Sequence, residues 1–157
     1  MKYVWGPWRM DYIKAEKPDG CILCLKPKED NDDKNHILYR GKMNFIMLNR
    51  FPYSPAHLMI APYRHVDSPE KLTPEERAEH FELVSHGVEV LRKEFNPEGF
   101  NLGMNLSKTA GAGIDDHIHT HIVPRWLGDT NFMTVIADVR VVPQALDETY
   151  RMLKGKF

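Results

Sequence analysis

The segment DHIHTHIVPRW, residues 116–126, carries a histidine at every second position: His117, His119 and His121. Residues two apart on a β-strand point to the same face, so a strand would place the three imidazoles in one row. On a helix, successive members of the set would be about 200° apart and would not converge. The β-branched residues between the histidines favour the strand, and Pro124 is expected to end it.

Three kinds of chemistry fit this row of histidines. The side chains are either structural with no reaction to perform, ligands of a shared metal ion, or a catalytic set in which one imidazole attacks. The preceding segment SKTAGAG, residues 107–113, favours phosphate chemistry. Its backbone N–H groups and the hydroxyls of Ser107 and Thr109 are donors for phosphate oxygens. Lys108 either pairs with phosphates or remains solvated.

A second set of reactive groups lies near the N-terminus, where Cys21 and Cys24 form a Cys-x-x-Cys pair. Such a pair serves either metal binding or redox chemistry. The thioredoxin-like pattern of strand, helix and strand does not surround it, which disfavours the redox interpretation. Two buried free thiols beside an adenine pocket, lined by Ile22 and Leu23, are the remaining alternative.

Short apolar segments separated by turn residues predict the strands that hold these groups. They cover residues 37–40, 45–49, 56–62, 100–106, 117–123 and 132–143. The most polar stretch, residues 26–36, predicts a solvated loop or a helix fragment. An aromatic segment, residues 5–13, predicts a short helix.

One long amphipathic helix is predicted over residues 73–95. Thr73 is a candidate N-cap, Pro74 takes the first helical position, and Glu76 completes a capping box. Spacings of three and four predict one buried stripe, formed by Phe81, Val84, Val88, Leu91 and Phe95. A shorter helix is expected within residues 144–156. Because strands and helices do not alternate regularly, we expect one α+β domain over residues 1–157, with a mostly antiparallel sheet.

Composition excludes several classes of partner. The chain has 157 residues and a net charge of −1, which suits a single core and argues against binding to a nucleic-acid polymer or an anionic membrane. No apolar run approaches the roughly 20 residues of a membrane span. The N-terminus MKYVWGPWRMDYI lacks the apolar stretch of a signal peptide, so we expect a cytoplasmic protein.

The motif His117-Ile-His119-Thr-His121-Ile-Val resembles that of the histidine triad (HIT) family of nucleotidyl hydrolases and transferases. A second stretch, NRFPYSPAHLMIAPYRH, resembles the family segment in which Asn precedes a histidine by eight residues. Its NRFP start is closest to the fragile-histidine-triad branch. The stretch AGAGIDDHIHTHIVPRWLGDTNFM looks most like the branch that acts on diadenosine tetraphosphate. The resemblance implies a HIT-like five-stranded sheet with one long and one short C-terminal helix, and a homodimer.

The resemblance also implies a role for each matching residue. His119 would be the nucleophile, and its other ring nitrogen would donate to a backbone carbonyl. His121 would bond phosphate oxygens and assist the leaving group, while His57 would be an accessory histidine. Asn49 would bind the ribose hydroxyls. Gly113 stands where other branches carry Gln, so backbone amides or a phosphate co-substrate would fill that space.

Some members of the superfamily bind structural zinc, and the matching residues here are Cys21, Cys24, His65 and His117. Two sulfurs and two nitrogens make a closed tetrahedral site, which would keep His117 out of the chemistry. Trp126 follows the triad and would either stack on a base or pack in the core or an interface. The loop at residues 128–132 would cover the distal nucleotide.

We therefore expect an enzyme that cleaves a dinucleoside polyphosphate, diadenosine tetraphosphate first, at the α-phosphate. The reaction would pass through nucleotidyl-His119, which phosphate or water resolves. Three alternatives remain open at this point. They are a nucleoside phosphoramidase, a regulatory nucleotide-binding protein with a vestigial triad, and a metallohydrolase with three histidines around one catalytic metal.

Overall fold

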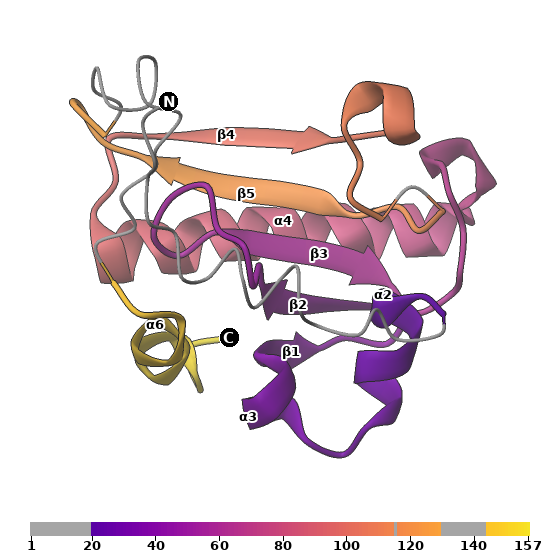
Figure 1. Ribbon diagram of the computed structural model, residues 1–157, viewed down its shortest axis with the longest axis horizontal. Coiled ribbons are helices and arrows are strands. Elements are labelled where there is room, and N and C mark those ends of the chain that lie inside the picture. Colours follow the sequence, from indigo (N-terminus) through magenta and orange to yellow (C-terminus); the bar gives the residue numbers. More distant parts are fainter. Residues whose placement is uncertain (1–19, 115, 130–143) are drawn as a thin grey trace, which may run out of the picture.

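The computed structural model describes residues 20–114, 116–129 and 144–157. Five strands form one antiparallel sheet in the order β1-β2-β3-β5-β4 (Figure 1). The strands are β1 (Ile37–Arg40), β2 (Asn44–Leu48), β3 (Leu58–Pro62), β4 (Gly99–Met104) and β5 (Thr120–Arg125). The helices are α2 (Ile22–Leu25), α3 (Asp32–Asn35), α4 (Pro74–Phe95) and α6 (Leu146–Leu153), with 3-10 turns at Lys26–Lys28, Pro69–Lys71 and Lys108–Ala110. The predicted α+β fold with an antiparallel five-stranded sheet is confirmed.

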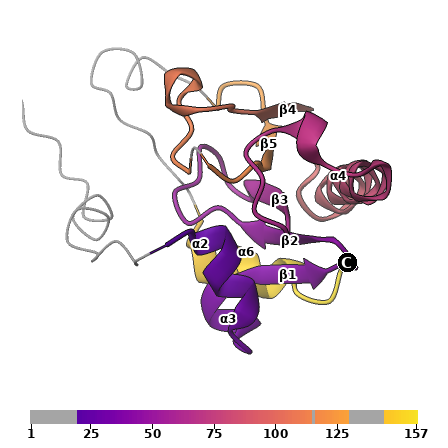
Figure 2. The ribbon, with the colours of Figure 1, turned by 90° about the vertical axis from the view of Figure 1, so that its right-hand side faces the viewer.

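Both faces of the sheet are covered, and by different helices. Helix α4 lies across one face and α2 lies against the other (Figure 2). Side chains of β2 and β3 alternate between the two layers, as strand geometry requires. Ile46 and Ile60 join the core beneath α4, whereas Phe45 and Met59 join the core with Leu23 of α2. This alternation defines an α4 face and an α2 face of the sheet.

Helix α4 begins as the sequence predicts. The Thr73 side chain accepts from the backbone N–H of Glu76, and the Glu76 side chain accepts from the backbone N–H of Thr73. Such a cap stabilises a helix by about 1 kcal/mol. Glu76 is buried and also bonds Arg64, whose guanidinium lowers the pKa of this carboxyl to about 2.

The predicted buried stripe of α4 is wrong at Phe81, which is 70% exposed. The buried face is rotated toward His80, Leu83, Gly87 and Val90. Gly87 allows the helix to approach β5, because a Cβ there would lie 2.9 Å from the Ile122 side chain. Close packing against three strands therefore decided the buried face.

The histidine segment differs from prediction at both ends. Strand β5 begins at Thr120, not at residue 117, because β3 pairs with β5 only from Ile60 opposite Thr120 onward. Pro124 lies inside β5, paired with Phe100 of β4, instead of ending the strand. The carbonyl of the next residue, Arg125, faces β4. The backbone nitrogen of Pro124 therefore points to the other side of β5, beyond the end of β3. The described residues place no strand there to accept a hydrogen bond, so the missing N–H of proline costs nothing.

The polar stretch 26–36 contains a 3-10 turn and α3, which agrees with the predicted helix fragment. The short closing helix is confirmed as α6. Its Tyr150 donates to the carbonyl of Ile37, which attaches the end of the chain to β1. The predicted strand 132–143 and helix 5–13 lie outside the described residues. No helix in the described part of the chain is long and apolar enough to cross a membrane.

Candidate active site and metal cluster

The register of β3 against β5 brings two of the predicted catalytic histidines together. His121 pairs with Met59, so both side chains lie on the α2 face. His57 precedes β3 by one residue and shares the parity of Met59. Its Nε2 lies 2.9 Å from Nδ1 of His121. Residues 64 positions apart in the chain thus meet on one face of the sheet.

Hydrogen bonds determine which ring nitrogens carry protons at this pair. The backbone N–H of Tyr53 donates to Nδ1 of His57 at 3.1 Å, so His57 presents a donor at Nε2. That donor is directed at Nδ1 of His121. Burial lowers the pKa of His121 to about 4, so its imidazole is neutral and carries its proton on Nε2. His121 therefore offers one N–H donor beyond the pair.

His119 has the geometry that a nucleophilic imidazole requires. It is 4% exposed, and its Nδ1 lies 2.8 Å from the backbone carbonyl of His117. Burial lowers the pKa of His119, so the ring is neutral with the proton on Nδ1. The lone pair is therefore on Nε2. Its ring centroid is 4.8 Å from that of His121, at an interplanar angle of 77°.

His117 does not join the other two imidazoles but turns toward the two cysteines. Its Nδ1 lies 3.3 Å from Sγ of Cys21 and 3.4 Å from Sγ of Cys24. The Sγ atom of Cys24 is also 3.3 Å from Nδ1 of His65. One ligand atom from each of these four residues lies within 4.8 Å of the others. The predicted Cys2His2 set is thus assembled in space.

The chemistry of this cluster fits a tetrahedral cation. Ligand atoms around zinc are separated by about 3.3–3.8 Å, given bonds of about 2.0–2.3 Å. The second ring nitrogen of His117 lies 2.8 Å from the Pro62 carbonyl, which leaves Nδ1 unprotonated. Nε2 of His65 lies 3.5 Å from a carboxylate oxygen of Asp116. Metal-bound histidines are oriented by acceptors of this kind.

Burial of the thiols also makes the cluster suited to a cation. Burial raises the pKa of Cys21 to about 11. A divalent cation opposes this effect, because thiolate ligands are deprotonated on binding. A metal ion bound by the four donors would therefore compensate the negative charge of the two thiolates.

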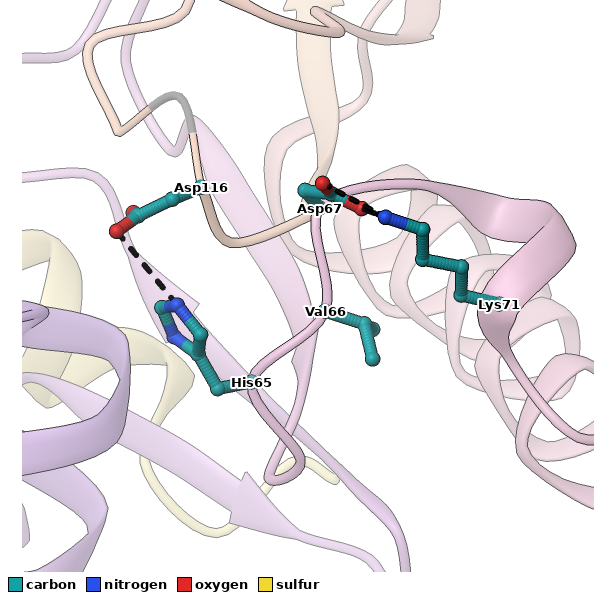
Figure 3. A pocket seen from close by; sticks show the side chains of 5 residues that line it. All are labelled: His65, Val66, Asp67, Lys71 and Asp116. Atoms are coloured by element: carbon teal, nitrogen blue, oxygen red, sulfur yellow. Dashed lines mark hydrogen bonds and ion pairs between the residues drawn. The ribbon is translucent and has the colours of Figure 1, made fainter.

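A small pocket opens beside this cluster, and His119 is not among the residues that line it. It is lined by His65, Val66, Asp67, Lys71 and Asp116 (Figure 3). Two contacts cross its walls, from His65 to Asp116 and from Lys71 to Asp67 at 2.6 Å. Its walls thus share His65 with the metal cluster, and they include Asp116, which contacts that histidine.

Asn49 lies close to the histidine pair. Its Nδ2 is 3.3 Å from Nδ1 of His57, and its Oδ1 accepts from the N–H of Phe51. Ala56, one residue before His57, is buried with a φ of 57°. Non-glycine residues in this region are strained and concentrate at functional sites. The turn from Asn49 to His57 is thus held in one defined shape.

The loop 107–113 connects β4 to the histidine segment, with Ser107, Thr109 and Gly113 exposed. Ser107 has a φ of 67°, and its carbonyl accepts from the N–H groups of Ala110 and Ala112. Among the described residues, neither hydroxyl is hydrogen-bonded to the histidines. A Cβ added at Gly113 would meet no atom within 4 Å. Gly113 is thus an exposed position with no close neighbour, and the contact predicted for it stays a prediction.

Sequence reasoning missed His80, which is buried beneath Thr120 on the α4 face. Its Nε2 lies 2.6 Å from Oγ1 of Thr120, and its Nδ1 lies 2.9 Å from Oδ1 of Asn44. The burial pattern of α4 that draws attention to it comes from the structure and not from the sequence. A lone histidine on a helix gives no such indication.

Fold and site together define an α+β domain whose antiparallel sheet carries a histidine cluster beside a Cys2His2 set. The HIT domain family model matches residues 30–126. The chain therefore belongs to the HIT family, whose domain occupies most of the described sequence.

Named relatives support this membership. A Mycobacterium tuberculosis protein named AP-4-A phosphorylase is 37% identical over 161 residues, covering 98% of this chain and 83% of that protein. A Schizosaccharomyces pombe protein named bis(5'-nucleosyl)-tetraphosphatase (asymmetrical) is 32% identical over 95 residues, covering 60% of this chain and 52% of that protein. A zinc-bound histidine triad protein from Mycobacterium smegmatis matches with a TM-score of 0.63 and 24% identity, covering 78% and 83% of the two chains, which shows the shared fold.

Proposed function

We propose that this HIT-family enzyme cleaves dinucleoside polyphosphates, diadenosine tetraphosphate first, through a covalent nucleotidyl-His119. The observation that carries the proposal is the 2.8 Å contact between Nδ1 of His119 and the carbonyl of His117. It holds the neutral imidazole in the tautomer whose Nε2 can attack. The name of the mycobacterial relative, AP-4-A phosphorylase, and that of the yeast relative, bis(5'-nucleosyl)-tetraphosphatase, support the substrate class.

In the first step, Nε2 of His119 attacks the α-phosphorus in line with the bridging oxygen. An N–P bond forms as the bond from phosphorus to that oxygen breaks, and the electron pair leaves with ATP. The imidazole becomes cationic, and its Nδ1–H keeps donating to the His117 carbonyl. This hydrogen bond stabilises the new charge. One difficult displacement is thereby divided into two easier ones.

His121 assists departure by donating from Nε2 to an oxygen of the reacting phosphates. His57 keeps this donor in place, because its own N–H occupies Nδ1 of His121. The neutrality of His121 avoids a second positive charge beside nucleotidyl-His119. Asn49, beside His57, is the residue we assign to the ribose hydroxyls.

In the second step, an oxygen of inorganic phosphate attacks the phosphorus, the N–P bond breaks, and its electron pair returns to His119 as ADP leaves. We assign phosphate as the acceptor because Gly113, which has no side chain, stands where other branches of the family carry Gln. Ser107, Thr109 and the backbone N–H groups of the loop 107–113 are the donors we assign to phosphate oxygens. The phosphorylase name of the mycobacterial relative agrees with this choice.

We further propose that Cys21, Cys24, His65 and His117 hold a structural zinc ion. The ion would cross-link the N-terminal segment to the sheet and would take no part in phosphate transfer. The carbonyl of His117 remains available to His119 when its side chain is a ligand. A reducing compartment, the cytoplasm, is the setting that keeps both cysteines available as ligands.

Incubation with diadenosine tetraphosphate, with and without inorganic phosphate, tests the reaction and the acceptor. We expect ADP and ATP to appear only when phosphate is present, as measured by ion-exchange separation of the products. AMP and ATP without phosphate would establish a hydrolase instead. If neither condition gave turnover while an adenosine phosphoramidate was cleaved, the dinucleotide assignment would be wrong.

We also propose a two-fold homodimer through the edge strand β4. Among the described strands, β4 lies at the edge of the sheet with one neighbour, β5 (Figure 1), and nearby apolar side chains are exposed, with Leu102 at 52% and Leu106 at 40%. An exposed apolar edge is a template for pairing with a second copy.

Sedimentation equilibrium tests the dimer. We expect the wild type to sediment as a dimer and Leu102→Arg to shift it to monomer, because a charge would be placed in the interface. Leu127→Arg is the matched control, since Leu127 is 91% exposed and lies outside β4. A monomeric wild type, or a Leu102→Arg variant that remains dimeric, would contradict the proposal.

A further inference from the structure

A buried network of hydrogen bonds runs behind the start of β5, the strand that directly follows His119. It connects Thr120 to His80 at 2.6 Å, His80 to Asn44 at 2.9 Å, and Asn44 to Glu79 at 2.9 Å. Asn44, His80 and Thr120 are 0%, 4% and 5% exposed. This hydrogen-bond network therefore crosses the α4 face of the sheet from β2 to β5, on the side opposite the catalytic histidines.

Each group in this chain has one donor or acceptor assignment. The Nδ2 atom of Asn44 donates to the Glu79 carboxylate and to the carbonyl of Glu76, so its Oδ1 is the acceptor. Nδ1 of His80 must donate to that oxygen. Burial lowers the pKa of His80 to about 4, so its ring is neutral and Nε2 accepts from the Thr120 hydroxyl. Every member is thus satisfied, which makes such a network rigid.

The far end of the chain is fixed to the backbone. The two carboxylate oxygens of Glu79 accept from the N–H groups of Lys42 and Met43 at 2.6 and 2.7 Å. Gly41 permits this approach, because a Cβ there would lie 2.9 Å from Oε1 of Glu79 and 2.8 Å from the Asn44 carbonyl. The turn between β1 and β2 therefore serves as the anchor of the network.

The near end of the chain lies between the two reacting histidines. Thr120 is the residue between His119 and His121, with its side chain on the opposite face. It is also the first residue of β5, where the ladder to β3 starts. Within the described residues, the backbone before it joins no strand and is held by the bond from the Ile118 N–H to the Val66 carbonyl. The side-chain bond at Thr120 is therefore a second restraint on rotation of the strand end. A misplacement of about 1 Å at a reacting group can cost about 100-fold in rate.

We propose that His80 is a positioning residue for nucleotidyl transfer, which acts through Thr120 to fix the strand end that carries His119 and His121. The proposal rests on the function proposed above. It assigns a role in the reaction to a residue that contacts no substrate. A network that served only the stability of the core would leave the rate per folded molecule unchanged when broken.

The test compares His80→Phe with His80→Gln. Phenylalanine fills similar space but removes both hydrogen bonds. The Gln amide can donate to Asn44 and accept from Thr120, as the imidazole does. We expect His80→Phe to reduce kcat by about 10- to 100-fold with KM nearly unchanged, and His80→Gln to restore it to within a few-fold. Thr120→Val, which removes only the hydroxyl, should resemble His80→Phe and should not add to it.

Two controls separate positioning from stability. His86→Phe alters a half-buried histidine of the same helix and should keep the wild-type kcat. Rates are normalised to the amount of folded chain, measured by circular dichroism well below Tm. Full activity per folded molecule in His80→Phe would overturn the positioning role, as would equal losses in the Phe and Gln variants. Absence of turnover by the wild type would overturn the proposed function and the positioning role together.

Discussion

Replacement of His119 by alanine is expected to lower kcat for diadenosine tetraphosphate by at least about 10⁴-fold, because removal of a covalent nucleophile costs up to about 10⁶-fold in a serine protease. In the proposed mechanism, Nε2 of His119 is the only protein atom that forms a bond to phosphorus. Nucleotide affinity should change much less, because His57, His121 and Asn49 retain the contacts among themselves. Steady-state turnover and equilibrium binding of a non-hydrolysable analogue measure the two effects separately.

The covalent intermediate supplies an independent measurement for the same residue. The wild type is incubated with diadenosine tetraphosphate at neutral pH without phosphate, and the reaction is quenched early. Intact-mass spectrometry should then show that the protein has gained the mass of one adenylyl group. His119→Ala should show none, and His86→Ala should behave as the wild type. If His119→Ala kept both its turnover and its nucleotide affinity, the triad would be vestigial. If it retained the adenylyl group, another residue would be the nucleophile.

Removal of the proposed zinc ion is expected to destabilise the fold. Cys21, Cys24, His65 and His117 come from three segments far apart in the chain, and a shared ion would join them. We expect the Cys24→Ser variant to lose at least about 3 kcal/mol of unfolding free energy, a fraction of the roughly 10–16 kcal/mol found for structural zinc in small peptides. The corresponding fall in Tm is about 6–12 °C. Calorimetry and metal analysis of the purified chain measure both quantities.

Metal removal should also reduce turnover, because His117 has two functions. Its side chain is a cluster member, and its carbonyl accepts from Nδ1 of His119. A displaced His117 would leave the nucleophile without its orienting acceptor. As a control, chelator should not affect the Cys21→Ser/Cys24→Ser double variant, which has no site left to strip. A wild-type chain purified without metal, with a Tm indifferent to added zinc, would refute the assignment.

Local sequence signals predicted the elements well where neighbouring residues alone decide the structure. The capping box at Thr73 is one case, since its partners are three residues apart. The strand cores are another, because alternation of side chains is built into the extended backbone. The signals failed at one position of the buried face of α4, since Val84 and Leu91 are buried as predicted. Phe81 fits the helical period but is exposed, because the angle at which α4 crosses the sheet is set by the strands beneath it.

The sequence by itself determined the chemistry available: three alternating histidines, a cysteine pair and a loop rich in small residues. It also indicated, by resemblance, which residues belong together. Only the tertiary structure decided which atoms meet. Cys21 reaches His117 across 96 positions, and His57 reaches His121 across 64. Such contacts follow from strand register and chain reversal, which no local pattern encodes, and the same packing placed His80 behind Thr120.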